Sequence, residues 1–423
     1  MLTENKIKNI KAIEVLDCRG NPTVEVQVLT EKGISDKAIV PSGMSTGIHE
    51  SVEIRDGEKR YLGKGVRTAV NNVNSIIFKN LKGRDITNQE EIDKILIELD
   101  GTENKSTLGS NATTAVSIAI SKTAAKVLQI PIYEHIGNKN SHVLPIPFMN
   151  LINGGKHAGS DLAFQEFIIA PINSNTYGES LAQCVEVYKI LREIILKKFD
   201  KYAVNVGDEA GYTPRIKTPE EALDLLHEAV EESGYTEIFK YALDSAASHI
   251  YDPKRDKYRI YDDKELSKEE LIEYYKELVD KYNIISIEDP LDQEDFEGFT
   301  EITSELSIQI VGDDLFVSNP HILEKGVKMS AANSVLLKVN QIGTLTEALE
   351  TTKIAITNNY RIMVSERSGD TEDDFLSDLT VAINAGQIKT GAPARSERTS
   401  KYNQLLRIEE ELGKKAEYGG KFF

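Results

Sequence analysis

The sequence predicts an α/β protein in two parts: a small N-terminal α+β domain, residues 1–137, and a C-terminal (β/α)8-type barrel, residues 138–423. The chain has 423 residues, more than one ordinary core of about 150 residues would hold. The local pattern changes near residue 145, and beyond it seven successive apolar runs end in a charged residue. These observations favour a barrel beside a smaller domain.

The N-terminal part begins with strands and continues with helices. The segments IKAIEVLD (10–17) and PTVEVQVLTEKG (22–33) alternate apolar and polar residues as strands do, and the loop MSTGIHES (44–51) comes later. Helices are then predicted at about 65–80, 88–100 and 110–128, the last capped by Ser110 or Asn111. Strands followed by helices indicate a compact α+β domain, and the Pro-rich hinge 130–147 leads out of it.

From about residue 145, short apolar runs alternate with helical segments, two of which begin with capping boxes at Thr218–Glu221 and Ser267–Glu270. The runs and the residues that end them are AVNVGDEAG, KYALDSAAS, IISIEDPL, IQIVGDDLFVS, SVLLKVNQIGT, YRIMVSERSGD and INAGQIKTGAP. In a closed parallel barrel the carboxyl ends of all strands open on one face, so we expect these charges to meet at its mouth. The alternative is that each charge only ends its strand at the surface.

The charges at the predicted mouth have a definite chemistry. Asp244, Glu288 and Asp313 offer oxygen ligands with no cysteine or paired histidine beside them, a set that suits Mg²⁺ rather than zinc. Lys338 and Lys389 follow on later strands. A lysine beside a divalent ion and a second cation has its pKa lowered toward that of a usable base, so Lys338 is predicted to remove a proton. The alternative is a structural ion pair of Lys338 with Asp313 or Glu288.

Composition excludes several classes of function. A formal net charge of -18 argues against a nucleic-acid partner or an anionic membrane surface, because no basic face is available. The two cysteines, Cys18 and Cys184, form no metal cluster and suit a reducing compartment. The N-terminus lacks the apolar segment of a signal peptide, and no run of 18 apolar residues occurs. We therefore expect a cytoplasmic protein without a membrane span.

Nine segments in collinear order resemble the enolase family from end to end: LDCRGNPTVEV, PSGMSTGIHE, NGGKHAG, FQEFIIAP, VGDEAGYTP, SIEDPL, VGDDLFVSNP, LLKVNQIGTLTEA and IKTGAPARSERTSKYNQLLRIEEEL. The resemblance implies the Mg²⁺-dependent interconversion of 2-phosphoglycerate and phosphoenolpyruvate in glycolysis and gluconeogenesis. It also implies a barrel with a ββαα start, two Mg²⁺ per active site, and a homodimer or an octamer.

The resemblance also implies roles for single residues. Asp244, Glu288 and Asp313 would hold the first Mg²⁺, and Ser45 the second, which arrives with the substrate phosphate. Lys338 would take the C2 proton, and Glu209, hydrogen-bonded to Glu166, would protonate the departing hydroxyl. The remaining residues implied to face the substrate are His157, Gln165, Lys389 and the phosphate-binding pair Arg367 and Ser368. The loop that carries Ser45 is implied to close over the site.

One position departs from the family pattern, because Glu366 stands where the family has histidine. We expect Glu366 to point away from the substrate phosphate, to be protonated, or to pair with a cation such as His157 or Lys389.

Other functions make different predictions for these residues. A sibling enzyme that removes an α-proton from another acid would lack Lys338 in combination with Glu166, Glu209 and the phosphate pair. A purely structural descendant is expected to have lost a metal ligand or the base, and an additional scaffold role would leave no mark in the sequence.

Overall fold

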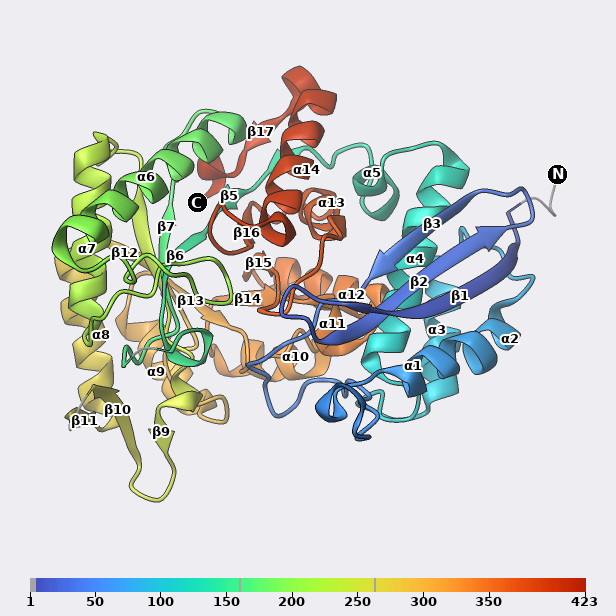
Figure 1. Cartoon of the computed structure of the whole chain (residues 1–423), viewed down its shortest axis with the longest axis horizontal. Helices are drawn as coiled ribbons and strands as arrows, with labels where there is room; N and C mark the ends of the chain where they lie inside the picture. Colours follow the sequence, from blue (N-terminus) through green and yellow to red (C-terminus); the bar gives the residue numbers. More distant parts are fainter. Residues whose placement is uncertain (1–4, 160, 262–263) are drawn as a thin grey trace.

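The computed structural model describes residues 5–159, 161–261 and 264–423, and it divides into the two predicted parts (Figure 1). The N-terminal part holds an antiparallel sheet of β1 (Ile7–Leu16), β2 (Pro22–Thr30) and β3 (Ser35–Ile39), in that order. Its helices are α1 (Arg67–Asn71) and α2 (Phe78–Leu81), joined by a π-helical segment (Asn72–Ile77), then α3 (Gln89–Asp100), α4 (Ser110–Leu128) and α5 (Ile132–Ile136). The three predicted helices therefore form, the first with a wide π-helical turn in its middle.

The predicted cap of α4 is wrong. The helix begins at Ser110, and its N-cap is Gly109, whose φ of 95° lies in the region that glycine favours. Asn111 instead makes two hydrogen bonds to the backbone of Ile54, with its amide donating to the carbonyl at 3.1 Å and its oxygen accepting from N–H at 3.3 Å. The polar side chain at the helix start thus fixes the segment that follows residues 42–51 (SGMSTGIHES, called loop 42–51 below), rather than the helix end.

The barrel sheet has the strand order β5-β16-β15-β14-β13-β12-β8-β7-β6. Its strands are β5 (Ile146–Pro147), β6 (Met149–Asn153), β7 (Glu166–Ala170), β8 (Lys240–Asp244), β12 (Ile284–Glu288), β13 (Gln309–Gly312), β14 (Ser334–Leu337), β15 (Arg361–Ser365) and β16 (Gln387–Lys389). Only Phe148 separates β5 from β6, and its N–H donates to the carbonyl of Ile388 at 2.8 Å. β5, which pairs with β16, therefore continues into β6, which pairs with β7, and this closes a ring of eight strand positions.

The start of the barrel has the expected ββαα pattern. β7 runs antiparallel to both β6 and β8, whereas the other barrel pairs are parallel. Two helices in succession follow it, α6 (Tyr177–Lys198) and α7 (Pro219–Ser233), before the chain returns to the sheet in β8. Because β7 is reversed, its first residue, Glu166, lies in register with Asp244 at the end of β8. An acid at the start of a strand thereby reaches the mouth.

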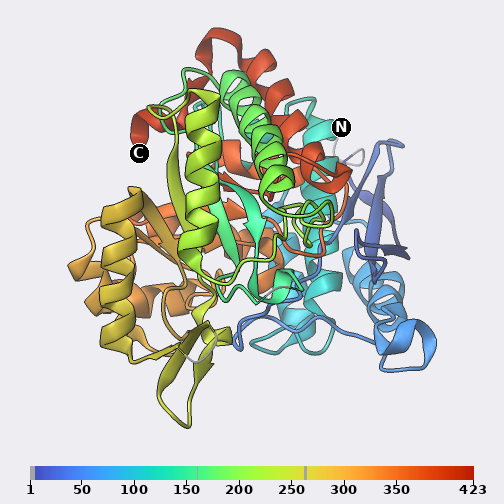
Figure 2. The ribbon, with the colours of Figure 1, turned by 60° about the vertical axis from the view of Figure 1, so that its left-hand side comes forward.

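Helices surround the barrel and a small three-stranded sheet projects from it (Figures 1 and 2). The later helices are α8 (Lys268–Tyr282), α9 (Phe296–Glu305), α10 (Pro320–Met329), α11 (Val339–Ile342), α12 (Leu345–Thr357), α13 (Phe375–Ala382) and α14 (Ser396–Leu412). The projecting sheet consists of β9 (Tyr251–Asp252), β10 (Lys257–Tyr261) and β11 (Lys264–Leu266). Elsewhere, β4 (Val143–Leu144) pairs with β17 (Glu417–Tyr418). Both predicted capping boxes are present at the starts of α7 and α8. Among the described residues, no helix combines the length and apolar character needed to span a membrane.

One of the seven predicted strand ends is wrong. The run AVNV (203–206) forms no strand, and only Val206 makes an isolated bridge, to Tyr212. Gly207 and Gly211 let this segment pack closely against Asn153. A Cβ on Gly207 would also lie only 2.4 Å from the carbonyl oxygen of His157. Glu209 therefore reaches the mouth from a tightly packed loop between α6 and α7.

The N-terminal part is fixed to the barrel at α11 and α12, the two helices that follow β14. Asp93 of α3 accepts hydrogen bonds from the backbone N–H and the hydroxyl of Thr346, at 3.0 and 2.6 Å. Ser51, at the end of loop 42–51, donates to the backbone of α11 through its N–H at 2.8 Å and its hydroxyl at 2.9 Å. This loop is thereby held beside the barrel mouth. The boundary between residues 137 and 138 stays a prediction.

Candidate active site

The charged residues from the strand ends meet at one mouth, which is where the sequence predicts them. Asp244 and Glu288 end β8 and β12, Asp313 and Lys338 directly follow β13 and β14, and Lys389 ends β16. These side chains are buried or nearly so. The surface reading of the strand-end charges is therefore excluded for these five residues.

Lys389 joins three carboxylates from three strands. Its Nζ lies 2.7 Å from Glu288 Oε2, 3.2 Å from Asp244 Oδ2 and 3.3 Å from Glu166 Oε1. Gln165, the residue before β7, also donates to Asp244 Oδ2 at 3.1 Å. Burial and repulsion from Asp244 still raise the pKa of Glu288 well above its usual range. Burial and the neighbouring acids together therefore outweigh the effect of Lys389 on Glu288.

Lys338 is paired with Asp313, its Nζ lying 2.6 Å from Oδ2. Burial is the largest single influence and opposes the charge on Lys338, but the attraction of Asp313 and Glu288 together offsets it, and the pKa of the lysine is raised. This direction is opposite to the predicted one. The prediction assumed a divalent ion beside the lysine, whereas here the Asp313 carboxylate acts directly on the ammonium group. A cation held by Asp313 would offset that carboxylate's effect.

Acidic groups fit a hard divalent cation at this mouth. Around Lys338 and Lys389 lie six buried carboxyl groups that supply only oxygen ligands: Asp244, Glu288, Asp313, Glu166, Asp289 and Asp314. Asp289 accepts the N–H groups of Asp313 and Asp314, at 2.9 and 2.8 Å, and the pKa of Asp314 rises to about 8 through burial and the neighbouring Asp313. So many buried acids need more positive charge than two lysines provide.

The predicted ligand triad does not form the tightest acidic cluster. Within the described residues, two sets of three groups bring their ligand atoms within 4.8 Å of one another: Asp289, Asp313 and Asp314, and His157, Glu166 and Glu209. Asp313 is the member that the first set shares with the predicted triad. The sequence reading missed Asp289 and Asp314, although both lie next to predicted ligands in SIEDPL and VGDDLF.

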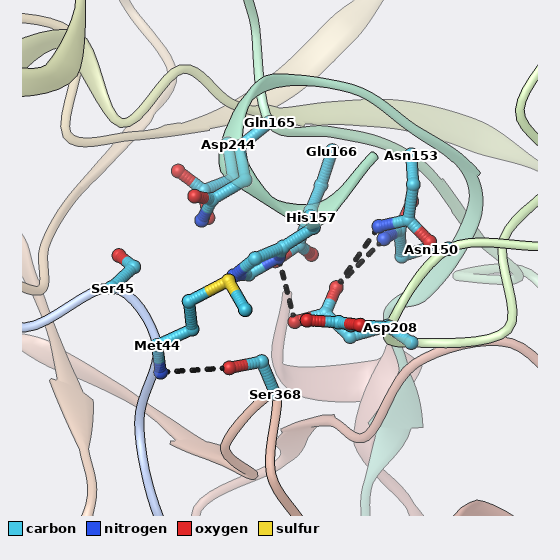
Figure 3. Close-up of polar contacts among 12 residues, drawn as sticks. Met44, Ser45, Asn150, Asn153, His157, Gln165, Glu166, Asp208, Asp244 and Ser368 are labelled. Carbon is cyan, nitrogen blue, oxygen red and sulfur yellow. Dashed lines mark hydrogen bonds and ion pairs between the residues drawn. The ribbon is translucent and has the colours of Figure 1, made fainter. Parts of the chain in front are cut away.

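His157, Glu166 and Glu209 form the second of these groups, and Figure 3 shows His157 and Glu166 beside Asn150 and Asn153. His157 Nδ1 lies 3.0 Å from Glu209 Oε1 and 3.9 Å from Glu166 Oε1. The amides of Asn150 and Asn153 donate to Glu209 Oε2 at 2.8 and 3.4 Å. The sequence reading missed both asparagines, which lie on β6 and face Glu209 rather than the core.

The protonation of this group differs from the prediction. Burial and the charge of Glu209 raise the pKa of Glu166 well above its usual range. Burial alone would raise the pKa of Glu209 as well, but His157 and the nearby cations outweigh it and hold that pKa well below its usual range. The two pKa shifts therefore favour Glu166 over Glu209 as the protonated acid. Glu209 contacts His157 in place of the expected hydrogen bond to Glu166.

Loop 42–51 covers the predicted phosphate pair. Arg367 forms a two-pronged ion pair with Glu50, at 2.8 and 3.0 Å, and donates to the carbonyl of Ser45 at 3.1 Å. Ser368 Oγ accepts the N–H of Met44 at 3.0 Å, as Figure 3 shows. Ser45 thus lies over the mouth through its backbone contact. Glu50 is a further residue that the sequence reading missed.

Glu366 has a partner, though neither of the two cations named as examples. It is buried and forms an ion pair with Arg398 of α14, and its pKa rises to about 8 through burial, an effect that Arg398 partly opposes. His157 and Lys389 are engaged with the acids described above. Of the expected alternatives, pairing with a neighbouring cation is therefore confirmed, with Arg398 as that cation.

Comparison with known proteins gives the family. The family model described as Enolase, C-terminal TIM barrel domain matches residues 141–423, and the one described as Enolase, N-terminal domain matches residues 7–136. The chain belongs to the enolase family. The resemblance drawn from the sequence motifs is thereby confirmed, together with the α/β fold and the lyase class of enzyme.

Curated relatives named Enolase match nearly the whole chain. The one from Methanocaldococcus jannaschii is 57% identical over 418 residues, 99% of this chain and 98% of that protein. The one from Methanopyrus kandleri is 55% identical over 418 residues, 98% of each protein. The one from Pyrococcus furiosus is 54% identical over 422 residues, 99% of this chain and 98% of that protein.

Proposed function

We propose that the chain catalyses the reversible dehydration of 2-phosphoglycerate to phosphoenolpyruvate, dependent on Mg²⁺, as a step of glycolysis and gluconeogenesis. The observation that carries this proposal is the position of Lys338 relative to the group of Glu166 and Glu209. In the ring of eight strand positions, β14 and β7 are four strands apart in either direction. A base on β14 and an acid at β7 therefore face each other across the mouth.

That arrangement suits an elimination. Lys338 would take the proton from C2 on one face of the substrate, and the hydroxyl on C3 would leave as water from the other face. Glu166, whose pKa is raised by burial and by Glu209, would hold the proton, and Glu209 would pass that proton on to the hydroxyl as it leaves. Their contact with His157 and two asparagines keeps Glu209 in place beside that hydroxyl.

The remaining residues would bind and orient the substrate. Lys389 and Gln165 would hold its carboxylate end, close to Asp244. Arg367 and Ser368 would bind the phosphate, since a guanidinium and a hydroxyl are suited to phosphate oxygens. The loop that carries Met44 and Ser45 would exclude water from the closed site.

We infer that Asp244, Glu288 and Asp313 hold one Mg²⁺, and that Ser45 ligates a second, which arrives with the substrate. When bound, the two ions would supply the positive charge that stabilises the extra negative charge left on the substrate carboxylate after proton removal. The surplus of buried acids over lysines at the mouth supports this assignment.

We further propose that the chain acts in the cytoplasm as a homodimer or an octamer, and that it binds no nucleic acid. The net charge of -18 supports the last point, because a nucleic acid requires a basic surface. The oligomer is inferred from membership of the family.

Absorbance near 240 nm tests the function directly, because the product has a conjugated double bond that the substrate lacks. With 2-phosphoglycerate, we expect a rise in absorbance with Mg²⁺ present and none after chelation, and restoration when Mg²⁺ is added back. Folded protein that gives no rise with Mg²⁺ would reject the proposal. A rise of equal rate in the chelated sample would reject the metal dependence alone.

A further inference from the structure

We propose that Arg398 is a positioning residue that holds the two loops on either side of the substrate at a fixed separation, and that Glu366 fixes the orientation of Arg398. This inference rests on the proposed function, because it assigns Arg398 to the geometry of that same site. The two loops are residues 366–368, with the predicted phosphate ligands, and residues 207–209, with Glu209.

The guanidinium of Arg398 contacts both loops through their backbone. Its Nη1 donates to the carbonyl of Arg367 at 3.1 Å, and its Nη2 donates to the carbonyls of Ser368 at 3.0 Å and of Asp208 at 3.1 Å. One planar group thus binds three carbonyls from two segments that are 159 residues apart in the chain. Carbonyls held in this way set where the side chains of their residues and neighbours lie.

Glu366 is placed to orient that planar group. Its carboxylate forms an ion pair with Nη1, the same nitrogen that donates to Arg367. Both side chains are buried, and the side chain of Arg398 is fully so. Asp370, the next nearest carboxylate, lies 3.8 Å from Nη1, beyond hydrogen-bonding reach. Glu366 is therefore the carboxyl group in direct contact with the guanidinium, and it is placed to fix the orientation of Arg398.

The contacts of Arg398 differ from those of an ordinary buried cation. Lys401, one turn further along α14, is equally buried and pairs with Asp370 at 2.9 Å. Its Nζ donates to the carbonyls of Thr371 and Glu397, at 2.5 and 2.8 Å. Neither of these two residues is a predicted site residue. Lys401 thus stabilises the fold near the site without bridging the two loops, which makes it a matched control.

Displacement of Arg398 would act on both ends of the substrate at once. On one side the side chains of Arg367 and Ser368 contact loop 42–51, where the phosphate would bind. On the other side the backbone of Asp208 continues into Glu209, which contacts His157. A lysine at position 398 keeps the charge but cannot donate to three carbonyls in one plane. The substitution Arg398→Lys should therefore loosen the spacing while leaving the core charged and filled.

The experiment compares Arg398→Lys, Glu366→Gln and the control Lys401→Met with the parent chain. For each protein, kcat and KM for 2-phosphoglycerate are measured with Mg²⁺, the affinity for inorganic phosphate is measured by calorimetry, and folding is checked by thermal unfolding. We expect Arg398→Lys to raise KM, weaken phosphate binding in parallel and lower kcat, with kcat/KM reduced about 100-fold, as a misplacement on the order of 1 Å would do. Glu366→Gln should change the same quantities in the same direction by about tenfold.

Lys401→Met should lower the unfolding temperature yet keep kcat, KM and phosphate affinity within about twofold of the parent. The proposal is overturned if folded Arg398→Lys keeps all three quantities, or if Lys401→Met loses them to the same degree. Phosphate affinity is read without turnover, so it reports on Arg398 even if the parent chain fails to dehydrate 2-phosphoglycerate. That last failure would reject the proposed function instead.

Discussion

Replacement of Lys338 by methionine is expected to lower kcat for the dehydration of 2-phosphoglycerate by roughly 10²–10⁴-fold, the range that a positioned general base contributes. Methionine keeps much of the lysine's length but cannot accept a proton. The remaining Asp313 keeps its hydrogen bond from Gln341 at 2.8 Å, so the pocket does not lose all its order. The measurement is the rate of absorbance change near 240 nm at saturating substrate and Mg²⁺.

The matched control for this variant is Lys105→Met. Lys105 is also buried, and its Nζ pairs with Glu347 at 2.8 Å, away from the barrel mouth. Its loss should reduce the unfolding temperature, because Glu347 loses its buried partner, while kcat stays near that of the parent. If Lys338→Met retains the parental kcat, or if Lys105→Met loses as much, the assignment of Lys338 as the base is wrong.

Conversion of Glu288 to glutamine is expected to weaken the activating Mg²⁺ by about 100-fold. The change removes one charged oxygen ligand that ends β12, and it also removes the carboxylate that lies 2.7 Å from Lys389. A neutral amide is a poorer ligand for a hard divalent ion. The measurement is the Mg²⁺ concentration that gives half-maximal activity, together with direct Mg²⁺ binding by calorimetry.

Asp378→Asn serves as the control, because Asp378 is a buried carboxyl outside the mouth. It lies on α13, accepts a hydrogen bond from Gln404 at 3.0 Å, and has a pKa raised to about 7, mainly by burial. Its substitution should leave the Mg²⁺ dependence unchanged. Equal Mg²⁺ curves for Glu288→Gln and the parent would exclude Glu288 as a ligand.

The fold could be predicted from the sequence because the charged ends of the strands repeat. Six of the seven runs are strands, and their order in the chain is also their order around the parallel part of the sheet. The remaining run, AVNV (203–206) before Glu209, has the same local pattern but belongs to a loop that packs on Asn153. A short apolar run does not distinguish a strand from a buried loop, since both cover apolar neighbours.

Protonation and pairing in the site could not be predicted in the same way. The pKa of Glu166 is raised by burial and by Glu209, whereas the contact with His157 lowers the pKa of Glu209. Arg398 lies 32 positions after Glu366, in a helix whose approach to the mouth no local pattern shows. Such pairs follow from tertiary packing alone. The motifs that carry these residues are nevertheless in the sequence, which is why the location of the site was predicted more successfully than its electrostatics.

The most direct test of the central claim is the exchange of the C2 hydrogen of 2-phosphoglycerate with deuterium from the solvent, followed by NMR with Mg²⁺ present. If Lys338 removes this proton while Glu209 assists departure of the hydroxyl, Glu209→Gln should still exchange the hydrogen although it forms little phosphoenolpyruvate. Lys338→Met should lose both exchange and product formation. Exchange that persists at the parental rate in Lys338→Met would contradict the account.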